Sequence, residues 1–199
     1  MLYLSVVFEG AVGVLSAVDV LNVPREKAYR LLHPKLVVVI SSSDEYGRGN
    51  VMTAAWAMPV SSAPPMVVVA ISPKRLTYEY VKSSKEFVIN VPSIDLIDQV
   101  RYFGSVSGKE ENKLSRAKVG NGRRVKAPIL LDSIAWLECK VTNEVEAGDH
   151  VLFIAEVIEA YVKKDALEED ITYNLERFKP ILHLGGDSYT TTIGGKVTF

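Results

Sequence analysis

Three short β-branched runs in the first third of the chain limit the folds that this sequence can form. They lie at residues 35–40, 51–56 and 66–71, and Ser, Gly and Pro are common in the segments between them. Those segments are too short for the crossover helix that must connect neighbouring parallel strands. The sequence therefore predicts an antiparallel meander or Greek key and not a Rossmann sheet.

Two long strands are predicted in the second half of the chain. In 134–145, apolar residues alternate with Glu138, Lys140, Thr142 and Glu144, a pattern that predicts one wet face and places Cys139 in the core. Segment 150–162 is apolar on both faces, as expected of a strand that lines a barrel and also meets a partner subunit.

Shorter elements are predicted around these strands. Further strands are expected at 86–91 and 182–184, and helices at 77–83 and from Ser93, as cap, to a point before Gly104. A single helical turn is expected within 111–117. These elements predict a mainly β barrel with a few short helices.

Composition excludes several classes of function. A net charge of −1 without a basic tail disfavours nucleic acid as a partner. The basic run 123–126 is expected to be a solvated loop. Cys139 has no second thiol to pair with, which indicates a reducing, cytoplasmic location. The three histidines show no metal-ligand spacing, so no metal site is predicted.

The first thirty residues are interpreted as an extension, followed by one domain at 31–199. Residues 1–23 are apolar, but Glu9 and Asp19 interrupt them and no basic region precedes them, so neither a membrane span nor a signal peptide is expected. We expect the extension to pack on the barrel or on a partner subunit. A start assigned too early is the alternative.

The segment Ser72-Pro73-Lys74-Arg75-Leu76-Thr77 predicts an anion site. It joins a strand to a helix start, and it places two cations beside hydroxyl groups and free backbone N–H groups. Arg75 can add a bidentate contact to a phosphate. The same pattern also fits an ordinary helix start with two exposed cations.

The second run offers a surface for a flat ring. Its residues supply an amide, a hydroxyl and small side chains, in Asn50, Met52, Thr53, Ala54 and Ala55. Backbone N–H groups together with Thr or Asn can stabilise a reduced flavin. The alternative is a core strand that includes Trp56.

Taken in order, these segments resemble the flavin reductase-like family of FMN-binding split barrels. The resemblance runs from about Leu31 to Thr192. It is carried by the motifs Asn50-Val51-Met52-Thr53, Ser72-Pro73-Lys74-Arg75-Leu76-Thr77, Phe87-Val88-Ile89-Asn90-Val91-Pro92, Leu137-Glu138-Cys139-Lys140 and Gly148-Asp149-His150. The chain departs from the family at Asn112-Lys113-Leu114, where Asp-Lys-Phe is frequent, and at Ala155-Glu156, where Gly-Glu is usual.

The resemblance implies a six-stranded antiparallel Greek-key barrel that forms a homodimer with FMN at the subunit interface. By the family pattern, Arg75 and Thr77 would hold the phosphate with Ser72 and Lys74 nearby, and Asn90 would support the ribityl chain. Ser107 and Gly108 match a Ser-Gly turn that adds contacts near the cofactor. The segment 50–55 would line the ring.

The implied activity is that of an oxidoreductase in which NADH or NADPH reduces FMN, and FMN passes electrons to free flavin, ferric iron or a protein. His150 matches a histidine found near the flavin in this family and is a candidate catalytic residue. A structural histidine at a turn is the alternative for His150. A flavin-binding electron carrier or sensor without NAD(P)H turnover is the second functional hypothesis. A barrel that binds no flavin is the third.

Overall fold

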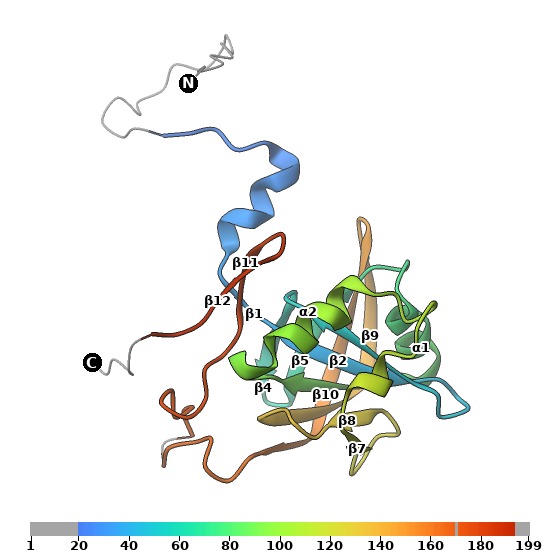
Figure 1. Ribbon diagram of the computed structural model, residues 1–199. Coiled ribbons are helices and arrows are strands. Elements are labelled where there is room, and N and C mark those ends of the chain that lie inside the picture. The colour runs from blue at the N-terminus through green and yellow to red at the C-terminus, as the bar shows by residue number, and fades with distance from the viewer. Residues whose placement is uncertain (1–19, 170, 194–199) are drawn as a thin grey trace.

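The computed structural model describes residues 20–169 and 171–193, which form a mainly β structure with short helices (Figure 1). The largest sheet has seven antiparallel strands. In spatial order they are β3 (Gly49–Ala54), β2 (Val38–Ser43), β6 (Glu86–Val91), β9 (Ala135–Ala147), β10 (His150–Val162), β5 (Pro65–Ile71) and β4 (Ala57–Ser62). The antiparallel, mainly β architecture predicted from the sequence is confirmed, with one strand more than the six expected.

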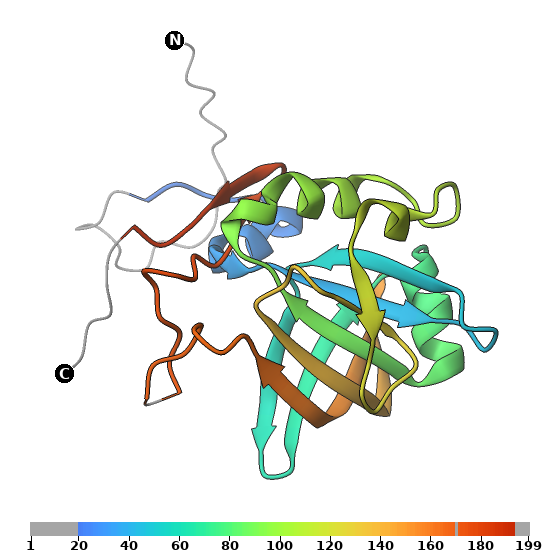
Figure 2. The same cartoon turned by 60° about the horizontal axis from the view of Figure 1, so that its bottom comes forward.

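The sheet closes on itself because its two edge strands are consecutive in the chain. β3 ends at Ala54 and β4 begins at Ala57, although the two strands lie at opposite edges of the sheet. Two intervening residues can span only about 10 Å, so the edges must lie close together. Figure 2 shows the resulting curled barrel. Ala55 and Trp56 therefore lie at the gap between the edges.

Two small sheets flank the barrel. One contains β1 (Lys35–Leu36), β11 (Leu182–Gly185) and β12 (Ser188–Thr190), and the other pairs β7 (Val119–Asn121) with β8 (Pro128–Leu130). The predicted strand 35–40 is thus divided at Val37, whose N–H donates to the carbonyl of Ile181 at 2.9 Å. β4, β7, β8 and β12 were not predicted from the sequence.

The helices are short. They are the 3₁₀ helices η1 (Arg25–Leu32), η2 (Ile94–Leu96) and η3 (Lys113–Arg116) and the α-helices α1 (Leu76–Ser84) and α2 (Ile97–Ser105). The helices predicted at 77–83, after Ser93 and within 111–117 are confirmed, although α2 continues one residue past Gly104, and η1 was not predicted. Ser93 does precede η2, yet its hydroxyl donates to the carbonyl of Lys179 at 3.4 Å and does not cap the helix.

Apolar side chains fill both the barrel and the space under α2. Val38, Ile40, Phe87 and Phe153 belong to the barrel core. Val37, Val39 and Val51 instead pack with Val100 and Phe103 of α2 on the outer side of the sheet. Both faces of β2 and β3 are therefore covered, which fixes α2 against the strand that carries the predicted ring contacts. Cys139 lies in the barrel core as predicted.

The prediction of a wet face on β9 is wrong at Glu138, whose side chain is fully buried. Its carboxylate accepts N–H bonds from Arg123 at 2.7 Å, Arg124 at 2.6 Å and Val125 at 3.0 Å, and the Tyr161 hydroxyl donates at 2.8 Å. Burial alone would raise the pKa of Glu138, but these hydrogen bonds lower it overall. The basic run 123–126 thus wraps a carboxylate of the protein itself.

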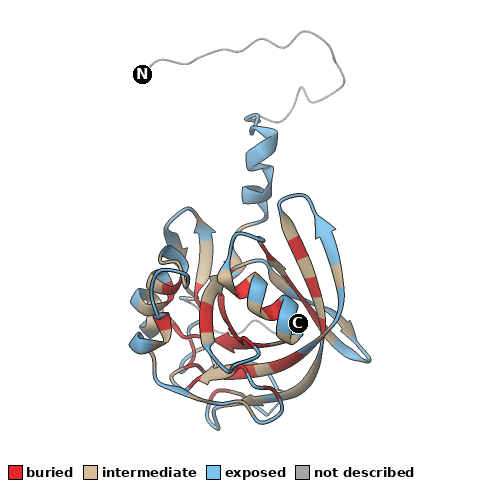
Figure 3. Ribbon diagram, turned by 90° about the vertical axis from the view of Figure 1, so that its right-hand side faces the viewer, coloured by how far each residue is buried: buried red, intermediate tan, exposed pale blue. Residues whose placement is uncertain are grey.

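Most of the predicted extension, residues 1–19, lies outside the described residues. Residues 20–32 are described, and Figure 3 shows η1 standing out from the barrel with exposed residues all around it. Tyr29 contacts the edge of the Trp56 ring, with ring centroids 5.5 Å apart. Within the part of the chain that the structure describes, no helix has the length and apolar character needed to cross a bilayer.

Candidate functional site

The loop before α1 forms the cationic part of the site. Arg75 is the extended residue at the start of the helix, and no side chain of the described residues caps this helix end. Its backbone N–H donates to the carbonyl of Ser72 at 3.0 Å, which makes a tight turn. Lys74 and Arg75 are exposed at its surface. The structure therefore places free N–H groups and two cations together, as the sequence predicts.

A buried hydrogen bond joins this helix to β3. The Asn50 amide donates to the Thr77 hydroxyl oxygen at 2.8 Å, and both side chains are buried. Gly108 packs on the other side of Asn50, since a Cβ on this glycine would lie 2.2 Å from Asn50 Oδ1. The predicted residues from β3, α1 and the Ser107-Gly108 turn thus meet at one place.

Lys113 of η3 lies at the same place and was not predicted as a site residue. Its side chain is buried, and the ammonium group donates to the carbonyl of Phe103 at 2.8 Å. It lines a small recess of about 30 Å³ together with Asn50, Met52, Lys74, Arg75, Thr77 and Ser107. Its burial cannot be read from a polar loop, and the only signal in the sequence is its place in Asn112-Lys113-Leu114, where the family frequently has Asp-Lys-Phe.

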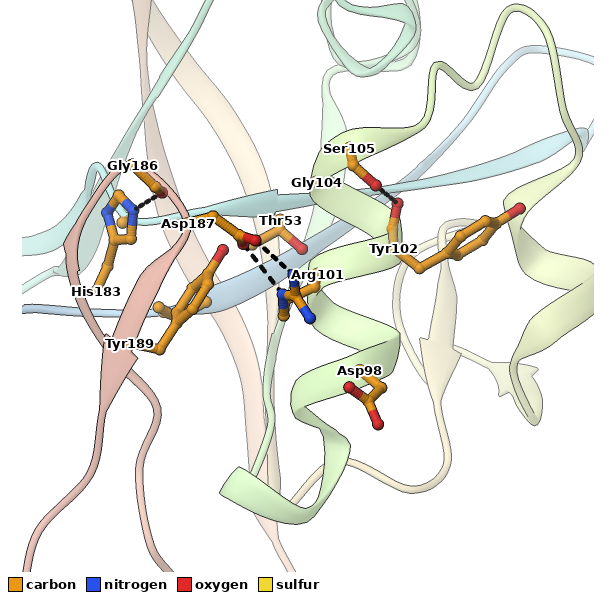
Figure 4. Close-up of a pocket in the computed structure, with 12 residues that line it drawn as sticks. Thr53, Asp98, Arg101, Tyr102, Gly104, Ser105, His183, Gly186, Asp187 and Tyr189 are labelled. Carbon is orange, nitrogen blue, oxygen red and sulfur yellow. Dashed lines mark hydrogen bonds and ion pairs between the residues drawn. The ribbon is translucent and has the colours of Figure 1, made fainter.

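A larger cavity of about 600 Å³ adjoins this recess, and Gly104 lines both. Its walls come from the end of β3, from α2 and from the hairpin β11–β12 (Figure 4). The lining side chains are Val37, Thr53, Ala55, Asp98, Arg101, Tyr102, Ser105, His183, Asp187 and Tyr189. A volume in this range is typical of sites for small molecules and cofactors.

An ion pair joins two walls of the large cavity, α2 and the hairpin β11–β12. Figure 4 shows Arg101 of α2 facing Asp187 in the turn of the hairpin, and Arg101 Nε donates to Asp187 Oδ1 at 3.0 Å. A second bond joins Arg101 Nη2 to Asp187 Oδ2. This interaction raises the pKa of Arg101 and lowers that of Asp187. The hairpin also contributes two rings to the wall, His183 and Tyr189, whose centroids are 5.3 Å apart and whose planes are tilted by 43°.

The ring contacts predicted in segment 50–55, in β3 and just after it, lie in two different spaces. Asn50 and Met52 line the small recess, and Thr53 and Ala55 line the large cavity. The Thr53 hydroxyl is directed to the carbonyl of Val100 at 2.6 Å. Ala54 faces the barrel core instead. The alternation of a strand explains this division, because successive side chains point to opposite faces.

Asn90 is not brought to either space. It is fully buried, its amide nitrogen donates to Val39 O at 3.0 Å and Ser41 Oγ at 2.9 Å, and its Oδ1 accepts from Leu130 N at 2.8 Å. These bonds tie β6 to β2 and β8, and they occupy both ends of the amide. Asn90 therefore supports the sheet beneath the site.

His150 lies at the start of β10, beside the gap between the sheet edges. Its ring packs on Trp56 with centroids 4.8 Å apart, and Nδ1–H donates to Asp149 Oδ1 at 2.8 Å. This bond lowers the pKa of Asp149. Because Asp149 holds the Nδ1 proton, Nε2 is the nitrogen left for another group. His150 lines neither the recess nor the large cavity described above.

Comparison with protein families gives one match that covers most of the chain. The model of the flavin reductase like domain matches residues 29–182. An uncharacterized protein of Archaeoglobus fulgidus is 37% identical over 80% of this chain and 89% of its own length.

Solved structures are also similar. An FMN-binding domain of a flavin reductase-like enzyme from Shewanella baltica has a TM-score of 0.73 at 27% identity, over 89% of this chain and 95% of that one. Flavoredoxin from Methanosarcina acetivorans has a TM-score of 0.82 at 23% identity, over 91% of this chain and 95% of that one, which shows a shared fold.

Proposed function

The chain belongs to the flavin reductase-like domain family, and we propose that it is an FMN-binding oxidoreductase that NADH or NADPH reduces. Its electron acceptor would be free flavin, ferric iron or a partner protein. The observation that carries this proposal is the pair of adjoining spaces that share Gly104, one cationic and one bounded by β3, α2 and two aromatic rings.

The residues present fit FMN. Arg75, Lys74 and the free N–H groups of α1 would hold the phosphate, with the Asn50–Thr77 pair behind them. Thr53, Ala55 and the backbone at the end of β3 would face the ring. The buried ammonium group of Lys113 supplies a further positive charge to the recess. A cationic recess beside a cavity of ligand size is the arrangement that a phosphorylated flat cofactor requires.

The protein would mainly orient the FMN ring and control which substrates reach it, and acid–base chemistry would be secondary. When bound, FMN supplies hydride acceptance from the nicotinamide and electron delivery to the acceptor. The Arg101–Asp187 pair would hold the hairpin against α2 beside the large cavity and so limit access to a bound ring. His150 is the proposed proton donor or substrate ligand, because Asp149 orients it and leaves Nε2 available.

A homodimer is part of this proposal. β10 lines the barrel with Val151, Phe153 and Ala155, while Leu152 and Ile154 lie on its outer face. Leu152 is opposite Ala70 of β5 in the sheet, and it lines an apolar groove of about 390 Å³ together with Trp56 and Met58. An apolar band of this kind favours contact with a second copy. The cytoplasmic location remains a prediction from the single cysteine.

The proposed activity is tested by rapid mixing of the FMN-loaded protein with NADH and, separately, with NADPH. Loss of the oxidised flavin absorbance with either donor is the expected result. Binding of FMN without reduction by either nicotinamide would favour the electron carrier instead. The described residues include no separate dinucleotide domain, so the nicotinamide would have to stack directly on the flavin.

A further inference from the structure

Lys113 is a buried cation with a single neutral partner. Its side chain is 4% exposed, and its ammonium group has one hydrogen bond among the described residues, to the carbonyl of Phe103. A lysine ammonium group has three N–H donors. Two of these donors therefore have no acceptor among the described residues. Lys113 also lines the recess at the start of α1.

The charges around Lys113 leave it without a counter-ion. The recess side holds the cations Lys74 and Arg75. On the other side, a second cavity is lined by the titratable groups Arg48, Tyr80, Lys109, Glu110 and Glu111. Glu111 accepts from the Tyr102 hydroxyl at 2.7 Å. Among the described residues, no carboxylate forms an ion pair with Lys113.

An unpaired buried ammonium group is unfavourable, and proteins normally pair such a charge or lower its pKa. Burial, followed by the positive charge of Arg75, lowers the pKa of Lys113 to about 8. The carbonyl at the C-terminal end of α2 supplies only a partial negative charge. An anion in the recess would supply the missing acceptors and the missing charge together.

We propose that Lys113 is the buried anchor of the phosphate subsite, and that a phosphate monoester bound there holds this lysine in its protonated form. The inference rests on the proposed binding of FMN. It adds Lys113 to the phosphate contacts of that site and makes the affinity for FMN depend on pH. Arg75 and Lys74 would contact the anion from the exposed side and Lys113 from the buried side. The subsite would then select flavins that carry a terminal phosphate over riboflavin.

Proton coupling follows from this arrangement. Above about pH 8 the lysine is mostly neutral in the free protein, so binding of the phosphate requires uptake of a proton. Affinity for FMN is therefore expected to fall by about tenfold between pH 7 and pH 9. Riboflavin lacks the phosphate, so its affinity should stay constant over the same range.

The test is a fluorescence titration of the full-length, cofactor-free protein with FMN and with riboflavin at pH 7 and pH 9. Lys113→Met should weaken FMN binding about 10- to 150-fold at pH 7, as expected for loss of a charge-assisted contact, and leave riboflavin binding unchanged. The remaining FMN affinity should no longer depend on pH. Lys118→Met removes an exposed lysine of the same charge and should behave as the wild type.

The melting temperature of the cofactor-free variant separates this role from a structural one. Replacing an unpaired buried charge by an apolar side chain of similar length should leave that temperature equal or higher. Equal losses of FMN and riboflavin affinity, or unchanged FMN affinity, would overturn the inference. Should Lys113→Met fail to fold, equal pH dependence of FMN and riboflavin binding in the wild type would also overturn it. A wild type that binds neither flavin would refute the proposed function itself.

Discussion

Gly108→Ala is expected to disrupt the buried bond that joins β3 to α1. The new Cβ would lie 2.2 Å from Asn50 Oδ1, a distance that real contacts do not reach, and 3.0 Å from Asn50 Cγ, which is an unusually tight contact. Asn50 cannot turn away freely, because it is buried and its amide donates to Thr77. Either that hydrogen bond breaks or the Ser107-Gly108 turn moves.

The cost follows from these two alternatives. Leaving a buried amide and hydroxyl unpaired costs about 1–3 kcal/mol, and overpacking a well-filled site costs a similar amount. We therefore expect a loss of about 1–3 kcal/mol in the free energy of unfolding. For a chain of this size, that loss lowers the melting temperature by about 2–12 °C. Binding of FMN should weaken as well, because Asn50 and Thr77 lie beside the proposed phosphate subsite.

Gly104→Ala is the matched control for stability. A Cβ there would meet Thr53 Cβ at 3.4 Å, an ordinary contact, and the residue lies within α2. Alanine should thus be neutral or stabilise the helix by up to about 1 kcal/mol. Differential scanning calorimetry of both variants measures the contrast. Equal melting temperatures for wild type and Gly108→Ala would show that Asn50 is not held in place.

Three further variants test other parts of the account. Glu138→Gln should destabilise the protein by roughly 2–3 kcal/mol at neutral pH by removing charge-assisted bonds. Because the folded-state pKa of Glu138 lies below its usual value, the stabilisation by the carboxylate is present above about pH 4.5 and is lost as the pH falls through the folded-state pKa. The free energies of unfolding of wild type and variant, measured in urea, should therefore converge in acid. Leu152→Glu should yield monomers in sedimentation if β10 forms the interface; an unchanged dimer would place the interface elsewhere. Arg75→Ala should weaken binding of FMN by about tenfold or more in calorimetric titration, with riboflavin unaffected; equal FMN affinity would show a misplaced phosphate.

The barrel could be predicted from the sequence because its strands are regular. Periodicity and short connections placed β2, β3, β5, β6, β9 and β10 and excluded parallel pairing. β4 escaped prediction because Pro59 interrupts it and Ser61 and Ser62 end it, so the segment lacks the alternation of a half-buried strand. Glu138 was assigned to solvent because a charged residue in an alternating strand normally faces water. Its burial depends on three N–H groups from a loop that sequence periodicity does not place.

The candidate site was predictable only where it is local in sequence. The turn at 72–77 and the end of β3 have recognisable chemistry, and the structure brings them together. Lys113 and Arg101 could not be found in the same way, because their roles depend on long-range packing. Arg101 meets Asp187 only after the hairpin β11–β12 folds over α2. Asn90 has the residue type of a ligand contact, but its bonds to β2 and β8 use the whole amide.

Binding of FMN is the central claim, and cofactor analysis of the purified protein tests it most directly. The protein is incubated with FMN and FAD together, freed of unbound flavin by gel filtration, and denatured, and the released cofactor is identified by mass. We predict FMN in equimolar amount with the chain and little FAD, because the cationic recess at α1 fits a single terminal phosphate. A colourless protein, or one that releases FAD, would contradict the account.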